Sequence, residues 1–161
     1  MEIDQQFTRG RIEENRMISN TEIREHASID GVPESTIERD YAQNWFLNAL
    51  YSVNNKMVLK GGTGIRKVYV KGYRFSDDLD FTLLNDIDKR TLNDLILRVI
   101  RNVKESCGID FNENIKINEN INGYEAAVYF RIIRRTGSPH KIKLDITNRE
   151  NEKIIFGKMR F

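Results

Sequence analysis

The chain has 161 residues, and its 26 basic and 24 acidic residues leave a net charge of only +2, which neither requires nor excludes a nucleic-acid partner. This length suits one domain spanning residues 1–161, and the single cysteine, Cys107, excludes an intrachain disulfide and a Cys/His zinc cluster. No apolar run approaches the ~20 residues of a membrane span, and the N-terminus lacks a signal-peptide core. We therefore expect a cytoplasmic location without membrane contact.

Helical signals dominate the first third of the chain. Residues 1–18 are polar and charged with little periodicity, which predicts a flexible arm. Asn20 or Thr21 is predicted to cap a short helix that stops at the Asp-Gly pair at 30–31. A longer helix is predicted over 34–54, because apolar residues recur there every four positions. The recurring residues, which we expect in the core, are Ile37, Tyr41, Trp45, Ala49 and Val53.

A glycine turn lies in the middle of the chain. The apolar run 57–59 predicts a short buried strand that ends at Gly61 and Gly62. Glycines let the backbone turn tightly and come close to a ligand. Thr63 can then cap a helix that extends to about Val70, so that backbone N–H groups point at the turn. Such an arrangement favours the binding of phosphate.

An acidic pair lies on the next predicted strand. Polar and apolar residues alternate over 78–83, which puts Asp78 and Asp80 on one face of the strand. Two carboxylates on one face repel each other unless a cation lies between them. Mg²⁺ suits such a place, because it takes one or two carboxylates together with substrate phosphates. The glycine turn and the acidic pair together indicate phosphoryl transfer to or from a nucleotide.

One amphipathic helix and several strands are predicted for the rest of the chain. Asp86 or Asp88 can cap a helix that ends at Cys107, before a glycine. The segment 125–134 is rich in β-branched and aromatic residues, which predicts a strand. A final strand is predicted around 154–156.

The alternating segment 141–147 completes the predicted sheet. Its apolar residues point one way, and Lys143 and Asp145 point the other. A hairpin of the last strands beside the 78–83 strand would bring Asp145 near Asp78 and Asp80. Helices followed by a mixed sheet, with helices on one side of it, predict the α+β class.

Three short motifs, in this order and spacing, carry a resemblance to a known family: Gly61-Gly62-Thr63, Arg74-Phe75-Ser76 and Asp78-Leu79-Asp80. They resemble the DNA polymerase β-like nucleotidyltransferase superfamily, and in particular its AbiEii/AbiGii-type branch, over about residues 20–150. That branch comprises toxins of abortive-infection and type IV toxin–antitoxin systems. The resemblance implies a polymerase β-like fold, in which N-terminal helices precede a mixed sheet with helices packed mainly on one side.

The resemblance also implies roles for single residues. The catalytic residues and ligands of Mg²⁺ or Mn²⁺ would be Asp78, Asp80 and Asp145, and the third acid would also help to deprotonate the attacking hydroxyl. The residues that hold the nucleoside triphosphate would be Gly61, Gly62, Thr63, Arg74, Ser76 and Lys143.

The implied activity is a metal-dependent transfer of a nucleoside monophosphate from a nucleoside triphosphate such as ATP or GTP. The acceptor would be a hydroxyl of tRNA or of a protein, and a cognate antitoxin would be the partner. Members of this family usually continue past the third acid into a helical C-terminal region. Because the sequence ends at Phe161, we expect that region to be missing. No motif specifies the nucleotide, the acceptor or the oligomeric state.

Two alternative functions remain open. The chain could be a nucleotide-binding domain without turnover. Residues 19–50 also have the spacing of a helix–turn–helix, which favours a DNA-binding module. Against the second alternative, Tyr41, Trp45 and Phe46 would bury the supposed recognition helix.

Overall fold

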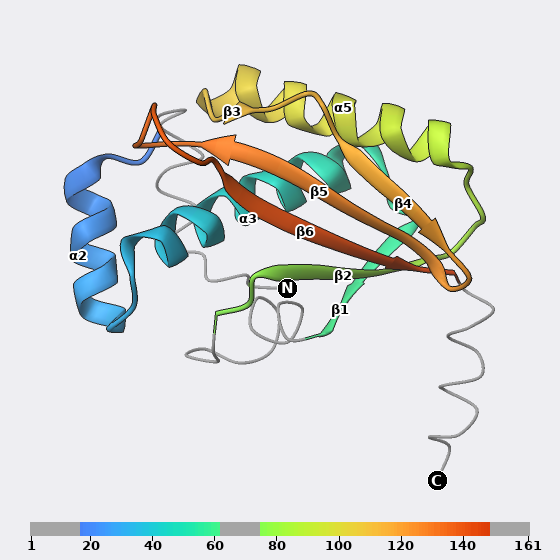
Figure 1. Ribbon diagram of the computed structural model, residues 1–161, viewed down its shortest axis with the longest axis horizontal. Helices are drawn as coiled ribbons and strands as arrows, with labels where there is room; N and C mark the ends of the chain where they lie inside the picture. The colour runs from blue at the N-terminus through green and yellow to red at the C-terminus, as the bar shows by residue number, and fades with distance from the viewer. Residues whose placement is uncertain (1–16, 62–74, 149–161) are drawn as a thin grey trace, which may run out of the picture.

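The computed structural model describes residues 17–61 and 75–148, and in this part of the chain three helices accompany one mixed sheet (Figure 1). The helices are α2 (Asn20–Asp30), α3 (Glu34–Val53) and α5 (Lys89–Cys107). The strands are β1 (Met57–Lys60), β2 (Asp78–Leu83), β3 (Asp110–Phe111), β4 (Lys116–Asn120), β5 (Gly123–Arg131) and β6 (His140–Thr147). The predicted α+β class is confirmed.

The sheet is antiparallel except at its centre. Its strand order is β1-β2-β6-β5-β3, and β4 also pairs with β5. The pair β2–β6 is parallel, whereas β1–β2 and β5–β6 are antiparallel. A parallel pair needs a long connection, which here contains α5 and strands β3 to β5 (Figure 1). The hairpin of β5 and β6 beside the 78–83 strand is therefore present as predicted.

One face of the sheet forms the core together with α3 and α5. The alternating apolar residues of β2 and β6 are buried on that face: Leu79, Phe81, Leu83, Ile142, Leu144 and Ile146. The other side chains of the same strands are half-buried or exposed. We call this second side the polar face; it carries Lys60, Asp78, Asp80, Thr82, Lys141, Lys143, Asp145 and Thr147.

The helix ends follow local side-chain chemistry, with one correction. Ser19, rather than Asn20 or Thr21, caps α2: the Ser19 Oγ accepts from the N–H of Glu22 (3.3 Å), and the Glu22 carboxylate accepts from the N–H of Ser19 (2.8 Å). This reciprocal capping box satisfies two otherwise unpaired donors. Helix α5 is capped by Asp88, one of the two residues predicted for this role. Its carboxylate accepts a hydrogen bond from the N–H of Thr91 (2.7 Å).

Helix α3 matches its prediction and lies deep in the core. Tyr41 and Trp45 are only 3% and 4% exposed, and their rings meet edge to face. Over residues 37–50 only Asn48 of α3 is exposed, so this helix has no free face that could enter a DNA groove, which argues against the helix–turn–helix alternative. No helix of the described segments is long and apolar enough to cross a membrane.

Some predictions fall outside the described residues. These are the arm up to residue 16, the helix after Thr63 and the strand at 154–156. At the end of the predicted arm, Ile18 is buried, and its N–H donates to the Tyr41 hydroxyl (3.2 Å). Strands β3 and β4 were not predicted, because β3 has two residues and β4 is almost entirely polar.

Candidate active site

Two of the predicted catalytic acids lie side by side in the structure. In the parallel pair of β2 and β6, Asp80 is the direct neighbour of Asp145, and Asp78 is the direct neighbour of Lys143. All four side chains are on the polar face and half-buried. Neighbouring strands lie about 4.8 Å apart. The two carboxylates therefore project from adjacent positions on one surface.

Asp80 carries the strongest electrostatic conflict of this group. Burial raises the pKa of its carboxyl group, and the negative charges of Asp145 and Asp78 raise it further. The ammonium groups of Lys60 and Lys143 lower this pKa and only partly offset the other effects. An ionised Asp80 is thus held in a place where additional positive charge would stabilise it.

The donor set fits a hard divalent cation. Asp80 and Asp145 offer carboxylate oxygens, with Asp78 two residues along the same strand, and oxygen is the ligand that Mg²⁺ and Mn²⁺ prefer. Within 17–61 and 75–148, no three acidic, histidine or cysteine side chains form a ready metal cage. The arrangement therefore suits a cation held by one or two carboxylates and completed by water and substrate oxygens.

Gly61 brings the backbone directly against the Asp80 carboxylate. Its φ is +72°, which lies in the left-handed region. A Cβ atom at this position would lie 2.3 Å from the Asp80 Oδ2. Glycine is favoured here, and the start of the predicted phosphate-binding turn abuts the predicted metal ligand. The other predicted nucleotide-binding residues of this region, Gly62, Thr63 and Arg74, lie outside the described residues.

Ser76 and Lys143, predicted to contact phosphate, lie at the same end of the site. The Ser76 hydroxyl donates to the backbone carbonyl of Asp78 (3.2 Å), and Lys143 is half-buried beside Asp78 on the polar face. Their contact with phosphate stays a prediction. The structure adds that Ser76 also shapes the backbone that leads into β2.

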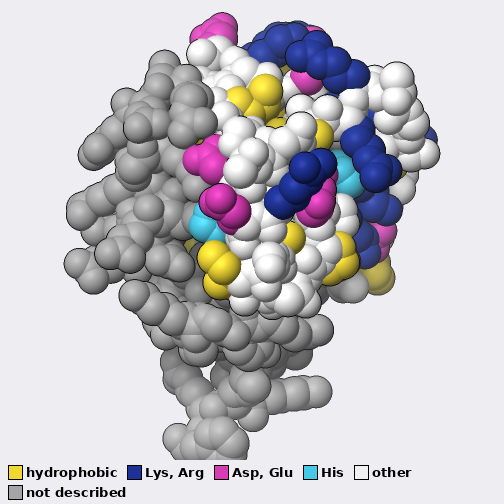
Figure 2. Space-filling model, turned by 90° about the vertical axis from the view of Figure 1, so that its left-hand side faces the viewer, with side chains coloured by type: hydrophobic (Ala, Val, Ile, Leu, Met, Phe, Trp, Pro, Cys, Tyr) yellow, Lys and Arg dark blue, Asp and Glu magenta, His cyan; other side chains and the backbone are white. Residues whose placement is uncertain are grey.

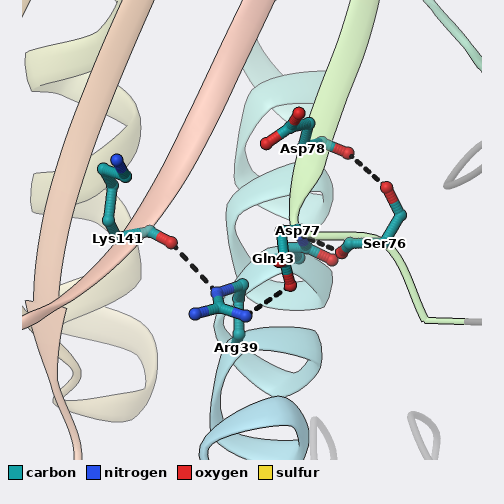
Figure 3. A network of polar contacts seen from close by, with 6 residues as sticks. All are labelled: Arg39, Gln43, Ser76, Asp77, Asp78 and Lys141. Atoms are coloured by element: carbon teal, nitrogen blue, oxygen red, sulfur yellow. Dashed lines mark hydrogen bonds and ion pairs between the residues drawn. The ribbon is translucent and has the colours of Figure 1, made fainter.

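Sequence reasoning missed a clasp that α3 forms on the two parallel strands (Figure 3). The Arg39 Nε donates to the backbone carbonyl of Lys141 (3.1 Å), and its Nη1 pairs with the Asp77 carboxylate. One turn further, the Gln43 amide donates to the carbonyl of Ser76 (3.0 Å). Arg39 and Gln43, the α3 clasp, thereby join the start of β2 to the start of β6.

A second contact joins α3 to the start of β6. The Nε2 of His140, the first residue of β6, lies 2.7 Å from the Oε2 of the buried Glu38. Polar residues at 38, 39 and 43 beside the apolar stripe of a core helix were the signal available in the sequence. The residues that they contact lie far along the chain, so the spacing of polar residues in this helix could not predict which residues these are.

Replacing Arg39 with methionine should destabilise the protein by about 1 kcal/mol, because the Arg39 side chain, which is only 21% exposed, loses its hydrogen bond to the Lys141 carbonyl and its ion pair with the exposed Asp77. The free energy of unfolding from urea denaturation measures this effect. Arg24→Met is the matched control, because the Arg24–Glu34 pair is 3.6 Å apart with side chains 69% and 56% exposed. Exposed pairs of this kind contribute little. Equal losses in both variants would show that Arg39 does not hold the strands.

Lys60 is the second residue that sequence reasoning missed. It ends β1, lies directly beside Asp80, and its Nζ donates to the Thr147 hydroxyl on β6 (3.3 Å). Burial lowers the pKa of the Lys60 ammonium group, whereas the charges of Asp80 and Asp145 act to raise it. Lys60 therefore interacts electrostatically with the acid pair. In the sequence, the only sign of this was a lysine directly before the glycine turn.

The raised pKa of Asp80 predicts a pH dependence of stability. The folded state binds the Asp80 proton more tightly than the unfolded chain does, so ionisation destabilises the fold above the raised pKa. This penalty is lost as the pH falls to about 4, the pKa of an unfolded aspartate. Without divalent metal, Asp80→Asn should therefore raise the melting temperature at pH 7.5, and the gain should shrink toward pH 4.

Asp88 provides a control of opposite sign for that experiment. Hydrogen bonds from Thr91 lower the pKa of the Asp88 carboxyl group. Asp88→Ala should therefore lower the melting temperature at pH 7.5, and its loss should also shrink toward acidic pH. A melting temperature that falls in both variants at pH 7.5 would contradict the conflict assigned to Asp80.

Comparisons with known proteins identify the family and the fold of this chain. The model of the nucleotidyl transferase AbiEii toxin family, of the type IV toxin–antitoxin system, matches residues 45–156, which is more than half of the chain. No curated protein matches. A crystal structure of a candidate nucleotidyltransferase from H. pylori superimposes with a TM-score of 0.53 at 24% identity, over 74% of this chain and 48% of that one.

The likeness to the H. pylori structure shows a shared fold, and the chain spans about half of that structure's length. The matched family segment includes β1, β2 and β6, the strands that carry Lys60, Asp78, Asp80 and Asp145. The polymerase β-like arrangement expected from the sequence motifs is thus supported by both comparisons. The chain belongs to the AbiEii family of nucleotidyltransferase toxins of type IV toxin–antitoxin systems.

Proposed function

We propose that this protein is a metal-dependent nucleotidyltransferase that moves a nucleoside monophosphate from a nucleoside triphosphate to a hydroxyl of tRNA or a protein. The observation that supports it most is the pairing of Asp80 with Asp145 on adjacent parallel strands, with Gly61 against the Asp80 carboxylate.

Each residue of the site has a role in the proposal. Held by one or two carboxylates of the set Asp78, Asp80 and Asp145, Mg²⁺ or Mn²⁺ would offset triphosphate charge and polarise the reacting oxygens. A carboxylate oxygen of Asp145 accepts the proton of the attacking hydroxyl, which forms a bond to the α-phosphorus as pyrophosphate leaves. Lys143, beside Asp78, offsets phosphate charge.

The turn after β1 is the proposed triphosphate site. Gly61 starts it next to Asp80, and the resemblance extends it to Gly62, Thr63 and Arg74, with Ser76 on the strand side. Since phosphoryl transfer depends mainly on placement and charge neutralisation, the protein's task is to hold these groups rigidly. The α3 clasp provides that rigidity at the start of both acidic strands.

The charge distribution favours tRNA over a protein as acceptor. Figure 2 shows Lys and Arg side chains gathered on the end of the molecule that carries α2 and the β5–β6 turn. Arg134, Arg135 and Lys141 are exposed there, and Lys141 precedes Lys143 on the same strand face. A basic surface of this kind attracts phosphate backbones. A cytoplasmic location, where triphosphates and tRNA occur, and restraint by a cognate antitoxin complete the proposal.

The test is incubation of the purified chain with Mg²⁺ or Mn²⁺, each labelled nucleoside triphosphate in turn, and either total RNA or total protein. Label in RNA or in protein, lost with a chelator, supports the enzyme and identifies its acceptor. Saturable nucleotide binding without transfer would overturn the proposal in favour of the inactive domain. A salt-sensitive shift of duplex DNA without transfer would instead favour the DNA-binding module.

A further inference from the structure

Lys60 extends across the strand that carries the acidic pair. Strand β1 lies on one side of β2 and β6 lies on the other. Lys60 is the direct neighbour of Asp80, yet its Nζ reaches the hydroxyl of Thr147 on β6, 3.3 Å away. Thr147 lies two residues beyond Asp145 on the same strand face. The ammonium group therefore lies against Thr147 on the polar face, where it interacts electrostatically with Asp80 and Asp145.

Lys60 is electrostatically linked to the acid pair: the charges of Asp80 and Asp145 act to raise the pKa of its ammonium group, against the larger lowering by burial. Lys60 and the two carboxylates influence one another electrostatically, and the Lys60 side chain is half-buried. A surface lysine normally keeps its ammonium group in water. Here the half-buried side chain instead donates to the Thr147 hydroxyl, on the strand face that carries Asp145.

We propose that Lys60 is an internal counter-ion of the Asp80–Asp145 pair that competes with the divalent cation for this position. The inference rests on the proposed metal-dependent function. A lysine tethered by Thr147 neutralises part of the acid pair when no metal is bound. A divalent cation that binds must then do so against the repulsion of the ammonium group, or after displacing it.

The competition makes metal loading depend on the nucleotide. Phosphate oxygens of a bound triphosphate would offer Lys60 a new anionic partner, since the turn that starts at Gly61 follows it directly. The metal would then bind weakly to the free protein and more tightly to the nucleotide complex. By linkage, nucleotide and metal increase each other's affinity. Because of this competition, the metal would occupy the site mainly when the nucleotide is also bound.

The experiment compares the binding of Mn²⁺ alone to the unaltered protein and to Lys60→Met, by electron paramagnetic resonance or calorimetry without nucleotide. We expect Lys60→Met to bind Mn²⁺ about tenfold more tightly, because one nearby positive charge is removed. Its melting temperature without metal should fall, and the increase caused by Mn²⁺ should be larger than in the unaltered protein.

Three further variants make the outcome decisive. Lys56→Met removes the same charge from an exposed residue just before β1 and should leave the Mn²⁺ affinity unchanged. Lys60→Arg keeps the charge and should resemble the unaltered protein. Asp80→Asn should abolish Mn²⁺ binding; if it does not, the metal site itself is wrong. If Asp80→Asn abolishes binding while Lys60→Met binds Mn²⁺ no more tightly than the unaltered protein, only the counter-ion role of Lys60 is overturned.

Discussion

Replacing Asp80 with asparagine is expected to abolish nucleotidyl transfer, by on the order of a thousandfold or more, in a protein that remains folded. Asp80 is the carboxylate on which the negative charges of Asp78 and Asp145 converge, and it lies against the turn that starts at Gly61. Asparagine keeps the shape of the side chain but removes its charge. The measurement is incorporation of labelled nucleotide, with circular dichroism to confirm the fold.

The control for this prediction is Glu119→Gln. Glu119 is an exposed acid on β4, so its replacement removes the same charge from the same sheet, away from β2 and β6. Its transfer activity should match that of the unaltered chain. Transfer that persists in Asp80→Asn at the level of the Glu119 variant would mean that the reaction is performed elsewhere.

Replacing Gly61 with alanine is expected to reduce both stability and transfer. A non-glycine residue at φ +72° loses about 1–2 kcal/mol from backbone strain alone. The added Cβ would also lie 2.3 Å from the Asp80 Oδ2, so the carboxylate must move. A displacement of about 1 Å in a catalytic group lowers rates on the order of a hundredfold. Urea denaturation and the transfer assay measure the two effects.

The variant Gly31→Ala distinguishes the effect of backbone strain from the effect of the contact with the Asp80 carboxylate. Gly31 ends α2 with φ +65°, and a Cβ there would meet nothing within 4 Å. This variant should lose a similar amount of stability from strain and keep its transfer activity. If both variants lost activity equally, the contact between Gly61 and Asp80 would have no part in catalysis.

The local patterns of the sequence predicted much of the sheet and the long helices. Alternation over 78–83 and 141–147 assigned the two strand faces correctly, because a period of two follows from strand geometry itself. The spacing of apolar residues predicted α3 to within one residue at its end. Strand β4 carried no such pattern, since only Ile117 among its five residues is buried.

The contacts that organise the candidate site were harder to predict, because they join distant parts of the chain. Arg39 and Lys141 are 102 residues apart, and Lys60 and Thr147 are 87 apart. Such pairs depend on strand order and register, which alternation does not determine. The nearness of Asp145 to Asp80 was predicted only on the assumption that their strands were neighbours. The structure supplies that register, and the metal and nucleotide roles await experiment.

The parallel pairing of β2 with β6 has a consequence for biosynthesis. The two acids belong to strands separated by α5 and the whole β3–β5 segment. During translation Asp78 and Asp80 emerge from the ribosome before Asp145. A hairpin formed from neighbouring strands cannot bring these acids together, because their strands are far apart in the sequence. The Asp80–Asp145 pair therefore forms only after β6 has been synthesised and inserted beside β2.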